Sequence, residues 1–359
     1  MPDPSEGRAT WGESRLVQPG WKAWFGAGLL LAAAAGVAVW RRRELARAFA
    51  LISRVDLPQL TVAVACEALS IVCLAAVSRW LLGAGGVRWS LRRTTAVVVA
   101  ANAVAGALPG GAALATAWAF RQLSRRRVGP ALAAAVLFCA GALSALGLGI
   151  LVVTGVLAAG TGGATTAAVV LRPLAGVLGL MLLVGLVLLG LSNSAGTRAL
   201  ARRYWDGVAR RHARARAVPQ ALAQVVEQAR SLRPGFRNWL WPAGLALLNW
   251  AFDAACLAAC LWALGVAVPW PGLLLAYALT QVPGSLRLTP GSLGVVETTL
   301  SALLVLYGLP PVAAIGGTLL YRALSYWALQ PIGWACWIGV TLDAPRTGRN
   351  VPPVPSDKP

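Results

Sequence analysis

Long stretches without a single charged residue constrain this chain more than any other feature of its sequence. The stretches that contain no Asp, Glu, Lys, Arg or His are 130–159, 173–197, 254–286 and 298–321, and two shorter apolar candidates are 23–40 and, with one acid inside it, 59–78. A helix that crosses the hydrocarbon core of a bilayer needs about 20 such residues. The runs are continuous, whereas the strands of a membrane barrel alternate apolar and polar residues over about 10 positions. The sequence therefore predicts an all-α fold, a polytopic membrane helix bundle.

The composition agrees with that class and limits the partners. Hydrophobic residues make up 58% of the chain and charged residues only 12%, against about 25% charge in an ordinary globular domain. The net charge of +20 comes from arginines between the apolar runs, which is the pattern of the positive-inside rule and of attraction to anionic lipid headgroups. We expect membrane lipids as partners and no nucleic acid, because a nucleic-acid surface needs a soluble basic face.

Proline-glycine breaks interrupt one apolar segment in each half of the chain. In the first half, Leu108-Pro109-Gly110-Gly111 divides segment 94–120, and in the second half breaks fall at Pro283-Gly284 and at Pro290-Gly291. A break at membrane depth is tolerated only where protein or a water-filled cavity covers the freed backbone groups. Two such segments in corresponding positions indicate an inverted repeat around a midplane site. We therefore predict about six full spans plus two re-entrant hairpins that enter from opposite faces.

The polar segments outline the domain organisation. We expect residues 1–22 to be a disordered cytoplasmic N-terminus, 23–340 to be the membrane domain, and the proline-rich residues 341–359 to be a disordered tail. Segment 193–238 carries ten Lys and Arg residues and is assigned to the cytoplasm by the charge rule. Within it, residues 198–216 fit either a basic amphipathic helix on the bilayer surface or a solvated linker helix.

Six ionisable residues lie within or beside the apolar runs, where a charge costs about 3 kcal/mol on insertion scales. They are Glu67, Arg172, Asp253, Arg287, Glu297 and Arg322. Arg287 and Glu297 bracket the second break, where free helix-end N–H groups beside a cation would suit a phosphate. Arg322 lies 11 residues into the last predicted span, 312–340. Its guanidinium is therefore expected at depth, where it would pair with an acid or contact a headgroup.

These charges and the breaks together predict a lipid-headgroup site near the middle of the membrane. Its predicted residues are Arg287, Glu297, Arg322, Asp253, Glu67, Asn102, Pro109, Gly110, Pro290 and Gly291. The alternative is that Glu297 and Arg322 form a buried ion pair that fixes helix packing, with no substrate involved. Arg172 is expected to reach the interface and to be structural.

The sequence holds no residue set for an enzyme, a metal or a cofactor. Its one histidine, His212, lies in the basic segment, which leaves no Ser-His-Asp set, and neither HExxH nor GxxxxGK[ST] occurs. The cysteines fall in apolar runs without the paired spacing and histidines of a metal site, so we expect packing residues. They are Cys66, Cys73, Cys139, Cys256, Cys260 and Cys336. We therefore expect no catalytic residues, no metal and no cofactor.

Motifs around the breaks extend over most of 59–340. They run from Asn102 through Leu108-Pro109-Gly110-Gly111 to Phe120-Arg121-Gln122-Leu123, and continue with Pro290-Gly291-Ser292-Leu293-Gly294-Val295-Val296-Glu297, Tyr307-Gly308, Tyr321-Arg322-Ala323-Leu324-Ser325-Tyr326-Trp327 and Pro331-Ile332-Gly333-Trp334. Together they resemble the transmembrane domain of lysylphosphatidylglycerol synthases and the related flippase-like membrane proteins, including small stand-alone actinobacterial members. The resemblance implies a helical membrane domain that handles lipid.

The sequence departs from that family's pattern at two points. Gly291-Ser292 stands where the family often has Gly-Gly, and residues 112–116 carry no charge where many members have an acid and an arginine. In longer relatives the resemblance implies that this domain moves aminoacylated phospholipid between leaflets, while lysine transfer belongs to a separate soluble C-terminal domain. This sequence ends at Pro359 without that domain. We therefore expect a flippase-like or lipid-binding protein of a bacterial cytoplasmic membrane and not a synthase.

Three functions stay open from the sequence. The first, which the breaks and the buried charges favour, is a translocase for a phospholipid or an isoprenoid phosphate whose headgroup meets the charges at the midplane. The second is a non-transporting scaffold or lipid-binding protein in which the buried charges are structural. The third is a membrane-embedded enzyme acting on lipid phosphates, which would need an acid–base pair, and Glu297 alone is thin support. Assembly into a homo-oligomer is also open.

Overall fold

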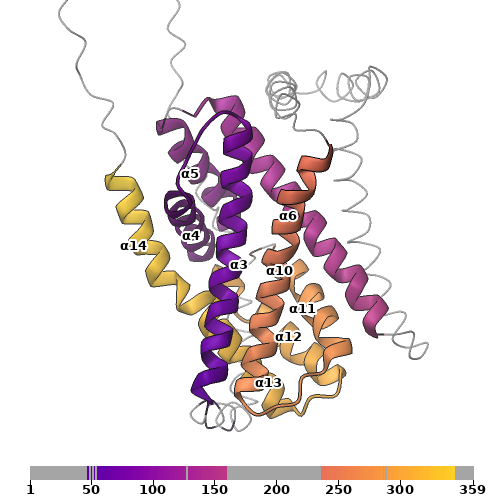
Figure 1. Cartoon of the computed structure of the whole chain (residues 1–359). Helices are drawn as coiled ribbons and strands as arrows, with labels where there is room; N and C mark the ends of the chain where they lie inside the picture. Colours follow the sequence, from indigo (N-terminus) through magenta and orange to yellow (C-terminus); the bar gives the residue numbers. More distant parts are fainter. Residues whose placement is uncertain are drawn as a thin grey trace, which may run out of the picture.

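Every regular element in the described part of the chain is a helix, which confirms the all-α prediction. The computed structural model describes residues 47, 50, 52, 55–126, 128–159, 236–285, 287 and 289–343. Figure 1 shows these helices as one bundle, with long helices running through it and shorter ones at its two ends. The predictions that lie outside the described residues are those for 1–22, 23–40, Arg172, 173–197, nearly all of 193–238, and 344–359.

Three helices are long and apolar enough to cross a membrane, judged by length and composition. They are α3 (Leu57–Ala84), α6 (Pro130–Ala159) and α10 (Phe236–Ala263). A helix of 28 residues, the length of α3 and α10, extends about 42 Å, which exceeds the roughly 30 Å of a hydrocarbon core. Both α3 and α6 have a proline in the first turn, where the missing N–H costs nothing. The total number of spans stays a prediction.

The first proline-glycine break lies where the sequence predicts it. Helix α4 (Leu91–Ala107) begins after Ser90, whose side chain caps the Arg93 N–H at 3.4 Å. It ends at Leu108, which is extended because the residue before a proline disfavours the helical conformation. Gly110 has a left-handed φ of +67° and starts α5 (Gly111–Arg125), which packs against α4. That this helix pair is re-entrant stays a prediction.

The second break lies at Pro290-Gly291, one of the two places that the sequence predicts in this segment. Helix α11 (Trp270–Ser285) continues through Pro283, so the other predicted break, at Pro283-Gly284, is wrong. The helix ends at Ser285, two residues after this proline. The interruption instead contains a 3₁₀ turn, η2 (Pro290–Ser292), before α12 (Val295–Leu306).

The last predicted span is not one uniform helix. It consists of α13 (Pro311–Arg322), a π-helical turn, η3 (Ala323–Trp327), and α14 (Leu329–Leu342). In the π turn the Ala328 N–H donates to the Ala323 carbonyl at 2.8 Å. Such turns add one residue to the helical register and frequently occur at functional sites. Here the turn carries Ser325 and Tyr326 toward the interior, where both line a cavity.

The helices pack around two apolar cores that lie at opposite ends of the bundle. Helix α3 packs along α10, α4 packs along α14, and α6 contacts α10 and α11. One core includes Ala63 of α3 and Ala254 of α10, and the other includes Val77 of α3 and Ala246 of α10. In Figure 1, α4 and α5 lie toward one end of α3, and α11, α12 and α13 toward the other. The middle of α3 and α10 therefore lies between the two cores.

Close packing in this bundle predicts different effects for two glycines of the same helix. A Cβ at Gly155 would lie 2.9 Å from the Leu275 backbone nitrogen of α11, whereas a Cβ at Gly141 would meet nothing within 4 Å. We expect Gly155→Ala to lower the free energy of unfolding in detergent by about 1–3 kcal/mol, because the backbone contact cannot relax. Gly141→Ala should be neutral or slightly stabilising, since alanine favours helix. Equal thermal shifts for the two variants would contradict this packing.

Candidate functional site

A cavity of about 350 Å³ lies between the two apolar cores. Helices α3, α4, α6, α10, α11, α12, α13 and α14 and the turns η2 and η3 contribute to its wall. Its polar and charged lining residues are Glu67, Ser70, Asn102, Ser144, Asn249, Asp253, Tyr277, Thr280, Gln281, Arg287, Ser292, Tyr321, Arg322, Ser325, Tyr326 and Gln330. A cavity with this lining, enclosed by apolar helices, is the kind of site that holds a polar group away from bulk water.

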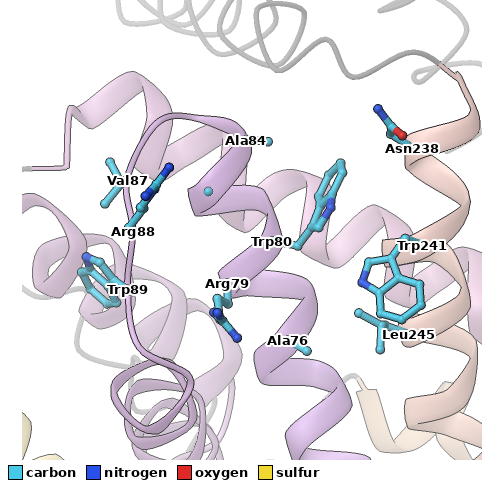
Figure 2. A pocket seen from close by; sticks show the side chains of 11 residues that line it. Ala76, Arg79, Trp80, Ala84, Val87, Arg88, Trp89, Asn238, Trp241 and Leu245 are labelled. Carbon is cyan, nitrogen blue, oxygen red and sulfur yellow. The ribbon is translucent and has the colours of Figure 1, made fainter.

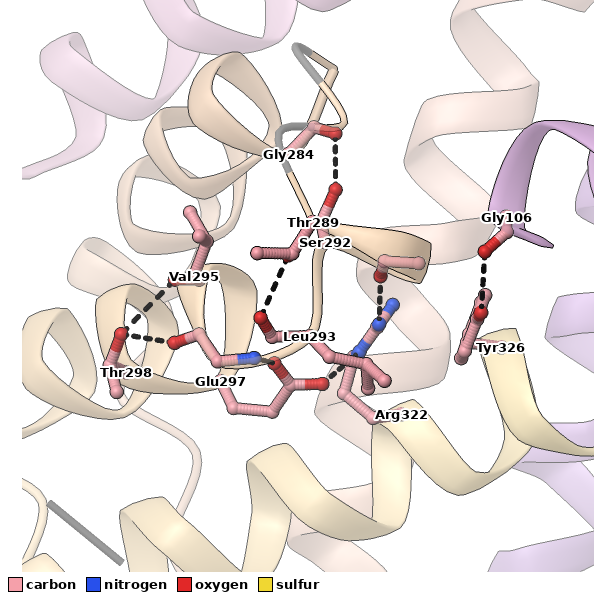
Figure 3. Close-up of polar contacts among 12 residues, drawn as sticks. Gly106, Gly284, Thr289, Ser292, Leu293, Val295, Glu297, Thr298, Arg322 and Tyr326 are labelled. Carbon is pink, nitrogen blue, oxygen red and sulfur yellow. Dashed lines mark hydrogen bonds and ion pairs between the residues drawn. The ribbon is translucent and has the colours of Figure 1, made fainter. Parts of the chain in front are cut away.

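The two proline-glycine breaks meet at this cavity. The Gly110 N–H of the first break donates to the Arg287 carbonyl of the second at 2.8 Å. The Tyr326 hydroxyl donates to the Gly106 carbonyl of α4 at 3.0 Å (Figure 3). A Cβ added at Gly106 or at Gly291 would collide with the Tyr326 side chain. Both glycines are therefore needed for the tyrosine to join α4 to η2.

The second break is an unusual piece of backbone held by its own side chains. Arg287 and Ser292 have positive φ angles of 45° and 54°, in the region that favours glycine. The Ser292 hydroxyl donates to the Gly284 carbonyl and the Thr289 hydroxyl to the Leu293 carbonyl, both at 2.8 Å (Figure 3). Ser292, which departs from the Gly-Gly of the resembled family, is thus accommodated because its hydroxyl closes the turn.

The Glu297–Arg322 ion pair links three elements beside the cavity. The Arg322 Nε lies 2.7 Å from the Glu297 Oε1, and the Arg322 Nη2 donates to the Gly291 carbonyl at 2.6 Å (Figure 3). The other Glu297 oxygen accepts the Gly294 N–H at 2.7 Å at the start of α12. The guanidinium also lies 4.6 Å from the ring centre of Tyr326. The pair therefore fixes η2, α12 and α13 together, as the structural alternative from the sequence expects.

Arg287 is the cation of the cavity that has no acidic partner in the described residues. It lines the cavity, is half-buried, and is absent from the ion pairs that the described part of the chain makes. Arg322, by contrast, uses two of the five N–H donors of a guanidinium on protein groups. Arg287 is therefore the side chain that could form an ion pair with a negatively charged ligand in this cavity.

Asp253 is held by two tyrosines from other helices. The Tyr277 hydroxyl of α11 donates to the Asp253 Oδ2 at 2.6 Å, and the Tyr321 hydroxyl of α13 donates to the Oδ1 at 2.8 Å. Both tyrosines are buried, with exposed fractions of 1% and 4%. Each oxygen of the carboxylate thus accepts a hydroxyl, which stabilises a negative charge there. Glu67 of α3 lines the same cavity and interacts electrostatically with this carboxyl group.

The structure brings together six of the ten predicted site residues. Those that line the cavity are Glu67, Asn102, Asp253, Arg287, Gly291 and Arg322. Glu297 touches the cavity only through Arg322, and Pro109, Gly110 and Pro290 shape the breaks without lining it. No observation tests whether any of them binds lipid, and that role stays a prediction.

Sequence reasoning gave no site role to Tyr277, Tyr321 or Asn249. A buried tyrosine in an apolar run needs a partner for its hydroxyl, which was a signal that could have found the first two. Asn249 and Asp253 are four residues apart and so share one face of α10. The Asn249 side chain donates to the hydroxyl of Ser70 at 2.8 Å and ties α10 to α3.

A second, larger pocket of about 970 Å³ lies near the C-terminal end of α3 and the N-terminal end of α10. Figure 2 shows Arg79, Trp80 and Arg88 on one side and Trp241 on the other. Trp80 packs edge-on against Trp239, with ring centres 5.5 Å apart. Tryptophan with arginine at helix ends is typical of the membrane–water interface. This pocket is separate from the central cavity, with which it shares no lining residue.

Comparison with known proteins places these features in a family. A family model described as "Lysylphosphatidylglycerol synthase TM region" matches residues 11–333. A "UPF0104 membrane protein" of Methanothermobacter thermautotrophicus is 27% identical over 106 residues. That match covers 29% of this chain and 32% of the relative, so the chain spans about a third of that protein's length.

The central ion pair and an exposed one predict different costs for removing a carboxylate. Glu297 is 17% exposed and lies 2.7 Å from Arg322, whereas Asp343 is 73% exposed and lies 3.5 Å from Arg126. We expect Glu297→Ala to lower the free energy of unfolding by about 3–5 kcal/mol, because it leaves a buried arginine unpaired. Asp343→Ala should cost less than about 1 kcal/mol. Thermal unfolding in detergent measures both, and a cost for Glu297→Ala as small as that for Asp343→Ala would contradict the structural role.

Proposed function

The chain belongs to the family of the lysylphosphatidylglycerol synthase transmembrane region, and from that membership and the charges of its cavity we propose that it moves a phosphate-bearing lipid headgroup between leaflets. The headgroup belongs to an anionic phospholipid or to an isoprenoid phosphate, which share the chemistry of a phosphate on an apolar tail. The chain is an integral membrane protein by its family and its apolar helices. The proposed place of action is the bacterial cytoplasmic membrane.

The observation that carries the proposal is an unpaired arginine in a polar cavity between apolar helices. Arg287 lines the cavity without an acidic partner in the described residues. Guanidinium groups bind phosphate with strong, charge-assisted hydrogen bonds. The outer helix surfaces are apolar, with Val62, Val64 and Leu69 exposed, and would leave the acyl chains in lipid.

The position of the cavity along the helices supports transfer rather than surface binding. Glu67 and Asp253 each lie about 5 Å from the middle of helices α3 and α10, at 1.5 Å per residue. In inverted-repeat transporters the substrate site lies at the interface of the broken helices near the bilayer midplane. The hydrogen bond between Gly110 and Arg287 joins the two breaks of this chain beside the cavity.

A non-transporting lipid-binding protein is the second candidate. The contacts of Glu297 and Arg322 favour it, because both side chains are engaged by protein groups and need no substrate to explain their burial. In this case the cavity would bind a headgroup without releasing it to the other leaflet. We propose no enzymatic activity for the described residues, since the acids near the cavity are occupied by tyrosines, an arginine or each other.

Substitution of Arg287 by an uncharged residue tests the proposed lipid transfer. We expect Arg287→Gln to reduce leaflet exchange of fluorescent phosphatidylglycerol in proteoliposomes by about 10- to 100-fold, because a hydrogen bond to a charged group is worth about 1.5–3 kcal/mol. Arg125→Gln, on the exposed end of α5, is the matched control and should exchange like the wild type. Retained exchange in a folded Arg287→Gln protein would contradict the proposal, and wild-type binding without exchange would favour the second candidate.

A further inference from the structure

The Glu67 carboxyl group has no role in the ion pair or in the anion contact proposed above. It is 9% exposed, lines the central cavity, and its Oε2 has no hydrogen-bond partner among the described residues. Asp253, another acid, lines the same cavity wall and interacts electrostatically with Glu67. A buried carboxyl group in the wall of a cavity, with a second acid in the same wall and one of its own oxygens unpartnered among the described residues, requires a physical explanation.

The tyrosines decide which of the two acids is ionised. Asp253 accepts hydroxyl hydrogens on both oxygens, from Tyr277 at 2.6 Å and Tyr321 at 2.8 Å, so its negative charge is stabilised where it lies. Both Asp253 oxygens already accept hydroxyl groups, and Glu67 could donate to that carboxylate only when it is itself protonated. Two ionised carboxylates in one low-dielectric site would repel each other strongly. The proton therefore belongs to Glu67.

The neighbouring groups offer no cation that would let both acids ionise. In the described residues, the titratable and charged groups that face the pair are Cys66 on α3, Cys256 and Cys260 on α10, Tyr277 on α11, and Tyr321 and Arg322 on α13. Arg322 is the one cation among them, and it is already paired with Glu297 at 2.7 Å. Arg287, the other cation of the cavity, is not among the groups that act on either acid. The thiols and hydroxyls can supply weak hydrogen bonds but no positive charge.

We propose that Glu67 and Asp253 form a proton-binding site in the wall of the cavity, and that binding of an anionic headgroup and retention of the Glu67 proton favour each other. The proposal rests on the function proposed above, because it names the coupling of that same site. With Glu67 neutral, the charges of Arg287 and Arg322 balance those of Glu297 and Asp253. A phosphate then adds one negative charge, and loss of the Glu67 proton to cavity water would add a second.

This linkage has a definite direction. Raising the pH removes the Glu67 proton and so weakens the binding of an anionic headgroup, and by reciprocity a bound headgroup makes the proton harder to remove. Typical coupling between sites corresponds to a 5- to 150-fold change in affinity. When the cavity opens to one side of the membrane, the headgroup and the proton would leave together, so a proton gradient could drive lipid in one direction.

Infrared spectroscopy of the purified full-length protein tests the proton directly, without lipid. The wild type should show a carboxylic-acid C=O band at neutral pH that disappears at high pH, and Glu67→Gln should lack that band. Asp343→Asn removes an exposed carboxyl group instead and should retain it. A band that Glu67→Gln leaves intact, or a wild type without such a band at neutral pH, overturns the proposal.

Lipid binding in detergent then tests the coupling. As pH rises from about 5 to about 10, across the range documented for buried glutamic acids, wild-type affinity for phosphatidylglycerol should fall at least 5-fold, while Glu67→Gln should bind at all pH values like the wild type at low pH. Affinity that depends on pH equally in both proteins overturns the coupling. Leaflet exchange is measured separately in proteoliposomes, so a protein with the Glu67 band and pH-dependent binding but no exchange retains the proton site and loses only the translocase function.

Discussion

The whole central structure depends on one constraint: backbone groups freed by a broken helix inside a membrane must be satisfied by the protein itself. The chain meets this constraint by bringing its two breaks into contact. The Gly110 N–H bonds to the Arg287 carbonyl, and the carbonyls of Gly106 and Gly291 accept from Tyr326 and Arg322. Neither break could be satisfied in this way alone, so the cavity and the paired breaks form together.

The same constraint divides the polar side chains into two groups. Arg322 and Glu297 form hydrogen bonds with each other and with backbone groups. We expect substitution of either residue to affect folding first. Arg287 lines the cavity without an acidic partner in the described residues, and Glu67 lines it with one oxygen that has no hydrogen-bond partner there. Burial alone does not distinguish these groups, because Glu67 is as buried as Arg322, at 9% and 8% exposure. What distinguishes them is whether a protein partner is present.

The sequence predicted what local chemistry controls. Charge-free runs predicted helices, and Pro109-Gly110 and Pro290-Gly291 predicted breaks, because proline and glycine act on their own backbone. The predicted break at Pro283-Gly284 was wrong, because α11 continues past this proline to Ser285. The sharing of Asp253 by Tyr277 and Tyr321, and its approach to Glu67, join residues from four helices. Helix packing decides such contacts, and a single sequence holds no direct signal of it.

The ion pair between Arg322 and Glu297 limits how strongly the cavity could hold the proposed lipid headgroup. A site that moves an ion or a headgroup must bind strongly enough to admit it and weakly enough to release it. Two free arginines would hold a phosphate by paired, charge-assisted bonds and would slow its release. Because Glu297 neutralises one of them at 2.7 Å, the cavity presents one unpaired guanidinium, Arg287, in the described residues. Under the proposed function, a single unpaired guanidinium would allow the headgroup to be released, and loss of the proposed Glu67 proton would weaken that contact further.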